Sequence, residues 1–384
     1  MASPSGRALL IVVVAFAAGR NTYGQAPESS PLFTRVSFSP AYVISTNPFA
    51  VSGAMPAGRN VNTVPSFTVE IGRQTDGSQE WHHAYNLPAY GFGVSVGAIG
   101  SGISRPLDVY TFFSWPFARL SDRLQVSTDF GMGASWNWKA LNHQTNAYNT
   151  VLGSNLNARI DWGFYLRYLA TSQASLYAGL DFTHRSNGGM VQPDQGINVI
   201  GPSVGVRYNF APERYRPPVN PPSAFHPSWE WIVGGTAGRK NVLDEQNDLD
   251  HNFGALAVTT AFQRHFYRYG KVAVGSDLMY DGSTGARVVD PITDTVQSGA
   301  FGDRLALGLY GGYEHVIGRF GAIVQVGYKA FNGSDDPRAA NLYERFGWRY
   351  HLGENFWGMF SVRAFDDRKA DALEFGFGYR SRVK

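Results

Sequence analysis

Hydrophobic and polar residues alternate along most of this chain, in segments of about ten residues separated by residues typical of turns. Successive side chains of a β-strand point to opposite faces, so this alternation predicts strands with one apolar and one polar face. Segments of this length and pattern are typical of transmembrane β-barrels. We expect sixteen strands, at residues 33–46, 64–73, 87–99, 106–117, 123–137, 155–168, 174–186, 198–210, 228–238, 253–267, 271–282, 301–314, 319–332, 341–351, 355–366 and 370–381.

The connections between these strands alternate in length. Bacterial barrels have short periplasmic turns and longer extracellular loops, and both chain ends lie in the periplasm. Connections near residues 120–123, 171–174 and 316–319 are short, whereas 140–153 and 187–197 are longer and polar. The pattern therefore predicts an all-β, antiparallel barrel with an even number of strands.

Composition supports a membrane barrel outside the cytoplasm. Only 16% of the residues are charged, against about 25% in an average soluble domain. No segment after residue 30 is apolar for the ~20 residues that a membrane-spanning helix needs. Arg7 and the apolar run at 8–18 predict a signal peptide within residues 1–26. The chain has no Cys, and its net charge of +3 does not indicate a nucleic-acid partner.

The second half of the chain resembles a degenerate copy of the first. We divide the chain into a first barrel half at 27–210, a proline-rich segment at 211–227 with six prolines, and a second barrel half at 228–384. Two architectures fit this division, a single barrel of sixteen strands and two tandem barrels of eight. We favour the single barrel, because a proline-rich periplasmic turn explains the middle segment without a second closure.

Three polar residues interrupt the apolar face of one predicted hairpin. The apolar row of segment 174–186 continues outward to His184 and Ser186, and the apolar row of segment 198–210 begins at Asn198. Polar groups facing lipid are costly, which favours a functional role. A serine, a histidine base and a third group that orients the imidazole form an activated nucleophile. The alternative is a polar rim at the membrane surface without catalysis.

The same segment carries a family resemblance. The run His184-Arg-Ser-Asn-Gly-Gly, followed by Gln192-Pro-Asp-Gln-Gly-Ile-Asn198 and a Gly-Val-Arg-Tyr strand, resembles the outer-membrane lipid A 3-O-deacylases of the PagL type and related acyloxyacyl hydrolases. The resemblance implies a serine esterase without a cofactor, with His184 as base, Ser186 as nucleophile and Asn187 as an oxyanion-hole candidate. Asn198 stands where the family has an acidic residue. Asparagine can orient an imidazole but does not stabilise an imidazolium by charge.

We therefore expect an outer-membrane hydrolase of a Gram-negative bacterium that removes an ester-linked acyl chain, at position 3, from lipid A of lipopolysaccharide in the outer leaflet. The alternatives are a non-catalytic porin or transport barrel and an outer-membrane lipid acyltransferase. We expect no metal, although His82 and His83 are adjacent in a periplasmic turn. Ser95 and Ser203 each lie in a Gly-x-Ser-x-Gly match, but no helix follows either strand, so we expect both to be dispensable.

Overall fold

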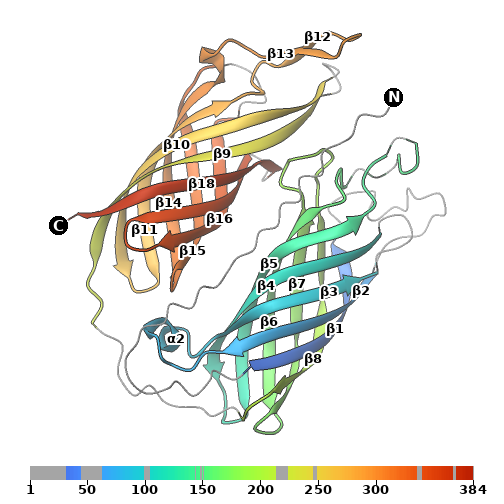
Figure 1. Cartoon of the computed structure of the whole chain (residues 1–384), viewed down its shortest axis with the longest axis vertical. Helices are drawn as coiled ribbons and strands as arrows, with labels where there is room; N and C mark the ends of the chain where they lie inside the picture. The colour runs from blue at the N-terminus through green and yellow to red at the C-terminus, as the bar shows by residue number, and fades with distance from the viewer. Residues whose placement is uncertain are drawn as a thin grey trace.

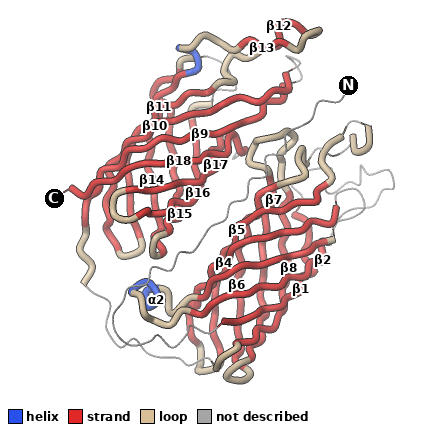
Figure 2. Tube along the Cα trace, viewed as in Figure 1, coloured by secondary structure: helices blue, strands red, loops and turns tan. Residues whose placement is uncertain are grey.

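The chain forms two closed β-barrels, one after the other along the sequence (Figure 1). The computed structural model describes residues 32–44, 63–98, 104–142, 144–147, 149, 151–212, 224–244, 249–334, 340–365 and 369–383. The predicted signal peptide at 1–26 lies outside the described residues, as does most of segment 211–227. Strands make up most of the described chain (Figure 2). No helix in these ranges is long and apolar enough to cross a membrane.

The first barrel contains eight antiparallel strands, each paired with the next along the chain. They are β1 (Leu32–Ile44), β2 (Thr63–Gln74), β3 (Ala89–Gly97), β4 (Ser104–Arg119), β5 (Leu124–Trp138), β6 (Asn157–Leu169), β7 (Ala174–Ser186) and β8 (Ile197–Asn209). β8 closes the barrel on β1, with Val206 opposite Val36. A short helix that the sequence did not predict, α2 (Glu80–Ala84), lies in the connection between β2 and β3.

The second barrel repeats this arrangement. Its strands are β9 (Ser228–Asp244), β10 (Leu249–Tyr267), β11 (Gly270–Asp281), β14 (Leu305–Ile317), β15 (Phe320–Asn332), β16 (Leu342–Leu352), β17 (Phe356–Phe365) and β18 (Lys369–Val383). β18 closes on β9, with Phe375 opposite Ala237. The loop between β11 and β14 holds a small sheet of β12 (Arg287–Asp290) and β13 (Thr295–Gln297) and the 3₁₀ turn η2 (Gly302–Arg304), none of which was predicted.

Two tandem barrels replace the single barrel that we favoured. The sixteen predicted segments match the sixteen barrel strands, and the all-β antiparallel fold is confirmed. The preference for one sixteen-stranded barrel was wrong, because β8 pairs with β1 and β18 pairs with β9. Each half is therefore closed and has no unpaired strand edge. A barrel in lipid must be closed in this way, because no water is present there to satisfy the backbone groups of an open edge. Segment 211–227 therefore joins two closed sheets instead of two neighbouring strands.

The strands present an apolar face outward and a polar face inward. On β7, Leu176 and Leu180 are 50% and 49% exposed, whereas the intervening Tyr177 is buried. The interior of the first barrel is filled by ion pairs. Arg35 contacts Glu70 and Asp129, and both Arg159 and Arg185 contact Asp108. All of these side chains are nearly inaccessible to solvent. Eight strands leave an interior just wide enough for such side chains, so the packing and the strand number agree.

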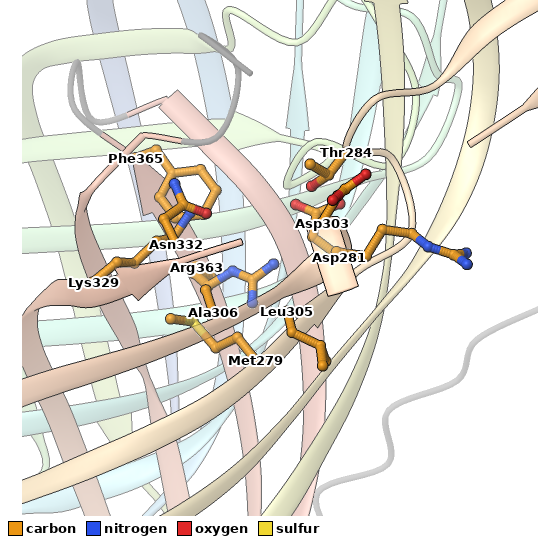
Figure 3. A pocket seen from close by; sticks show the side chains of 11 residues that line it. Met279, Asp281, Thr284, Asp303, Leu305, Ala306, Lys329, Asn332, Arg363 and Phe365 are labelled. Atoms are coloured by element: carbon orange, nitrogen blue, oxygen red, sulfur yellow. The ribbon is translucent and has the colours of Figure 1, made fainter. Parts of the chain in front are cut away.

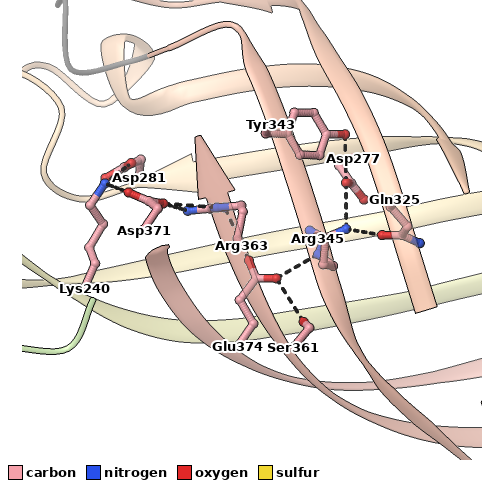
Figure 4. Close-up of polar contacts among 10 residues, drawn as sticks. All are labelled: Lys240, Asp277, Asp281, Gln325, Tyr343, Arg345, Ser361, Arg363, Asp371 and Glu374. Carbon is pink, nitrogen blue, oxygen red and sulfur yellow. Dashed lines mark hydrogen bonds and ion pairs between the residues drawn. The ribbon is translucent and has the colours of Figure 1, made fainter. Parts of the chain in front are cut away.

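The interior of the second barrel is also filled by charged side chains (Figure 4). Arg345 donates from Nε to Glu374 at 2.8 Å and from Nη1 to Asp277 at 3.0 Å. A small hollow remains where the loops begin, lined by residues that include Asp281, Lys329 and Arg363 (Figure 3). Neither interior resembles the water-filled lumen of a sixteen-stranded porin.

The connections divide each barrel into two ends, which we call the turn end and the loop end. At the turn end, turns of four residues join neighbouring strands, for example β4 to β5 and β6 to β7. The two barrels touch there through the residue that follows α2. The buried Tyr85 donates its hydroxyl to the carbonyl of Val316 at 2.6 Å and lies 3.0 Å from Nε2 of His315. An ion pair between Glu80 and Arg268 adds to this contact.

Candidate active site

Three of the predicted site residues meet at the loop end of the first barrel. β7 ends with His184 and Ser186, and β8 begins beside Asn198, which pairs directly opposite His184. Nδ1 of His184 lies 2.7 Å from Oδ1 of Asn198, and Nε2 lies 2.8 Å from Oγ of Ser186. The imidazole therefore bridges the amide and the hydroxyl.

The chemistry of these contacts fixes the tautomer of the imidazole. An amide oxygen accepts hydrogen bonds and does not donate them, so Nδ1 of His184 carries the proton toward Asn198. The lone pair of Nε2 then faces Ser186 and accepts from its hydroxyl. This is the arrangement in which a histidine can take the proton of a serine nucleophile.

The two residues meet without a β-bulge. Neighbours two apart on one strand are about 7 Å apart at the backbone, which made a bulge at this strand end a reasonable expectation. The structure pairs β6 and β7 regularly up to Ala158 opposite Ser186 and Ile160 opposite His184. The side chains of His184 and Ser186 therefore lean toward each other from regular strand positions.

Gly196 is a site residue that sequence reasoning missed. It adopts a φ of +69°, in the left-handed region that favours glycine. A Cβ at this position would lie 2.8 Å from Cε1 of His184 and 3.3 Å from Cβ of Ser186. The absence of a side chain thus leaves room for the imidazole. The sequence marks Gly196 as a turn residue, but nothing in it indicates contact with His184.

The site faces outward, onto the apolar side of the barrel. His184, Ser186 and Asn198 are partly buried and continue the outward rows of β7 and β8. Ile160, opposite His184 on β6, is 48% exposed, and Trp162 lies next on the same outward row. Polar groups of the site therefore adjoin a lipid-facing apolar surface, as the alternation along the strands predicted.

The loop between β7 and β8 is organised by a buried carboxylate. Asp194 accepts from the backbone N–H groups of Asn187 at 2.8 Å and Gly189 at 2.7 Å. Burial raises the pKa of the Asp194 carboxyl, and these N–H donors oppose that shift. Asp194 thus holds the loop, whereas Nδ1 of His184 contacts Asn198.

Asn187 contributes to the same loop. Its side-chain oxygen accepts from the N–H of Val191 at 3.1 Å, and its Nδ2 donates to the carbonyl of Val191 at 2.7 Å. The backbone N–H of Asn187 is also engaged, by Asp194. The oxyanion-hole role that the resemblance implies for Asn187 stays a prediction. In this role, the second hydrogen of Nδ2 would donate to the oxyanion.

The other candidate residues lie away from this site. Ser95 and Ser203 are buried on interior rows of the first barrel, as expected for strand positions. His82 and His83 lie in α2 at the turn end, and no group of three or more potential metal ligands occurs among the described residues. In the second barrel, β17 is the seventh strand, as β7 is in the first, and it contains no histidine.

The fold and the outward position of the site define a class of protein, the enzymes built as outer-membrane β-barrels. The profile of the family described as lipid A 3-O-deacylase (PagL) matches residues 66–207, in the first barrel. The profile described as acyloxyacyl hydrolase, C-terminal domain, matches residues 228–383, in the second barrel. The chain belongs to this lipid A deacylase family, and it is an ester-hydrolysing enzyme of the outer membrane.

Solved structures similar to this chain share little sequence identity with it. A structure described as the outer membrane enzyme PagL is 16% identical, covers 46% of this chain and 98% of its own, and has a TM-score of 0.30. CdiB from Acinetobacter baumannii is 10% identical, covers 92% of this chain and 60% of its own, and has a TM-score of 0.19. No curated protein sequence matches the chain significantly. The family assignment therefore depends on the two profiles.

Proposed function

We propose that this enzyme removes the acyl chain ester-linked at position 3 of lipid A, with Ser186 as nucleophile, His184 as base and Asn198 as the residue that orients the base. The observation that carries the proposal is the imidazole of His184, 2.7 Å from Asn198 on one side and 2.8 Å from Ser186 on the other. The family supplies the substrate class. The acyl position and the serine mechanism are our inference.

The proposed reaction proceeds in two stages. Nε2 of His184 takes the hydroxyl proton of Ser186 while Oγ attacks the ester carbonyl carbon, which forms a tetrahedral oxyanion. Collapse of this intermediate expels the sugar hydroxyl, which takes the proton from His184, and leaves the acyl chain on Ser186. A water molecule then attacks the acyl-enzyme, gives its proton to His184, and releases the fatty acid as Ser186 regains its proton.

The position of the site suits a lipid already in the membrane. An acyl chain approaching from the outer leaflet would lie along the outward surface of β6 and β7, where Ile160, Trp162 and Phe182 surround the site on its apolar side. Small Ala158, opposite Ser186, leaves the nucleophile accessible along that surface. An interior site would require the lipid to leave the bilayer, whereas this one does not.

The two alternative functions predict different outcomes. A porin requires an open lumen, but charged side chains such as Arg35 and Arg345 fill the described interiors. An acyltransferase would use the same nucleophile but deliver the chain to a lipid hydroxyl. Mass spectrometry of lipid A from a bacterium without such activity, after expression of this protein, distinguishes the reactions. We expect the loss of one acyl chain, and a gain in lipid A mass would contradict hydrolysis.

A further inference from the structure

The loop that joins Ser186 to Asn198 rests on the second barrel. The N–H of Asn241, on β9, donates to the carbonyl of Gly189 at 2.8 Å. The side-chain oxygen of Asn241 accepts from the N–H of Gln192 at 3.1 Å. One residue of the second barrel thus holds the loop at two points, within a few residues of the proposed nucleophile. Figure 1 shows the loop in yellow-green beside the red end of β17 and β18.

Apolar contacts accompany these hydrogen bonds. Leu373 is only 6% exposed, although Phe375 and Phe377 on the same outward row of β18 are 43% and 58% exposed. Gly188 of the loop lies beside Leu373. A Cβ on Gly188 would lie 3.3 Å from Cδ1 of Leu373 and 3.8 Å from Cγ2 of Val362. The loop therefore packs against the outer face of the second barrel at its loop end.

The exposure of Asn241 points to the same contact. Asn241 is 7% exposed, whereas Asn252, which pairs directly opposite it on β10, is exposed. Both are asparagines at the same height on the same face. A polar side chain on the outer face of a membrane barrel is costly unless it is paired. The oxygen of the Asn241 amide pairs with the loop of the first barrel. Its Nδ2 donates to Asp250 at 3.1 Å and to the carbonyl of His251 at 3.3 Å in the second barrel, so both ends of this buried amide are paired.

The loop is held from both sides. On the inner side, the carboxylate of Asp194 binds the N–H groups of Asn187 and Gly189. On the outer side, Asn241 binds Gly189 and Gln192. The two ends of this loop carry the nucleophile and the residue that orients the base, so its placement controls their relative positions. A shift of about 1 Å at a reacting group can lower a rate by ~10²-fold.

We propose that the second barrel is a positioning partner of the active site, and that Asn241 is its principal contact. This inference rests on the proposed function of Ser186 and His184. It gives a role to a barrel whose seventh strand, β17, contains no histidine. Asn241 contacts the loop and not the substrate, so it acts through the placement of Ser186.

The test is the substitution Asn241→Leu in the full chain, with Asn252→Leu as the matched control. Leucine keeps a similar volume but removes the acceptor for the Gln192 N–H, together with the Nδ2 bonds to Asp250 and the carbonyl of His251. The backbone bond from Asn241 to Gly189 stays in place. We expect kcat to fall about tenfold or more, with KM changed less than about twofold. The loss should be equal for lipid A and for a short-chain p-nitrophenyl ester, because a displaced nucleophile slows both substrates. Asn252→Leu should match the unmodified protein.

The conservative variant Asn241→Gln keeps an amide, with an acceptor oxygen for Gln192 and a donor for Asp250, and should restore most of the activity. Heat-modifiable gel mobility reports folding. If Asn241→Leu does not fold, Leu373→Ala, which shortens the side chain beside Gly188, should lower kcat in the same way. Activity of Asn241→Leu equal to that of Asn252→Leu, or a loss confined to KM for lipid A, would overturn the inference. Full activity of Ser186→Ala would instead overturn the proposed function.

Discussion

The imidazole of His184 and the amide of Asn198 face each other across the β7–β8 pair, with 2.7 Å between Nδ1 and Oδ1. The third position of the proposed triad is therefore neutral. Its amide fixes the tautomer of His184 but provides no negative charge as the imidazole becomes protonated. This pair sets the first prediction.

Substitution Asn198→Ala should lower kcat by about 10²-fold with little change in stability, because it removes the group that orients His184. Asn198→Asp is isosteric and should retain or raise activity. Any gain in kcat should appear as pH rises through the range in which the aspartate ionises, because only the carboxylate stabilises the imidazolium. The nearby hydrocarbon opposes this ionisation and raises the pKa of the aspartate. The pH profiles of kcat for the three proteins measure this. A profile of Asn198→Ala that matches the unmodified protein at every pH would contradict the assignment.

Substitution Gly196→Ala should lower activity, because a Cβ there would lie 2.8 Å from Cε1 of His184. Gly353→Ala is the matched control. Its φ of +68° imposes the same backbone strain, but no atom lies within 4 Å of the added Cβ. We expect Gly196→Ala to lose on the order of 10²-fold in kcat, and Gly353→Ala to lose none. Equal activities of the two variants would show that Gly196 does not shape the site.

The α2 contact at the turn end should depend on pH. Burial lowers the pKa of His82 to about 4, against the opposing effect of Asp76. The folded-state pKa lies below the ordinary value of about 6.5, so the folded protein resists protonation of His82. Its contribution to stability is complete above about pH 6.5 and is lost as pH falls from there toward 4.

Thermal unfolding of the purified protein across this pH range measures the effect. The variant His82→Gln should show a weaker decline in melting temperature toward low pH than the unmodified protein. His226→Gln replaces an exposed histidine and is the control. An identical decline in all three proteins would contradict the role of His82.

Removal of Arg345 should destabilise the second barrel. Arg345→Met leaves the buried carboxylates of Asp277 and Glu374 without their shared cation. Breaking a buried ion pair by removing one partner costs about 3–5 kcal/mol. Arg287→Met, at an exposed position of β12, should cost little. Denaturant unfolding in detergent compares the two variants, and equal free energies of unfolding would contradict the assigned role of the interior network.

The sequence predicted the strands and the outward placement of the site well, because both depend on a local period of two. The row containing Leu176 and Leu180, extended to His184 and Ser186, required only alternation along one strand. The expectation that His184 and Asn198 lie close together followed from their positions at the same end and on the same face of one hairpin. Such local patterns survive folding because a one-residue slip would turn every side chain to the wrong face.

Closure and long-range contacts were beyond these local patterns. Strand patterns are the same whether β8 pairs with β1 or with β9, so the single barrel could not be rejected from alternation. The contact of Asn241 with Gln192 joins positions 49 residues apart on different barrels. Gly196 looked like any turn glycine until the imidazole of His184 was placed beside it. These features depend on tertiary packing, which a single sequence does not display.

The most direct test of the account is mass spectrometry of lipid A from cells that express Ser186→Ala, compared with cells that express Ser203→Ala. Both are serine-to-alanine changes in the first barrel, but Ser203 is buried on an interior row and Ser186 lies 2.8 Å from Nε2 of His184. With folding verified by heat-modifiable mobility, we expect Ser203→Ala to remove the acyl chain and Ser186→Ala to leave it in place. Deacylation by folded Ser186→Ala protein would contradict the serine mechanism.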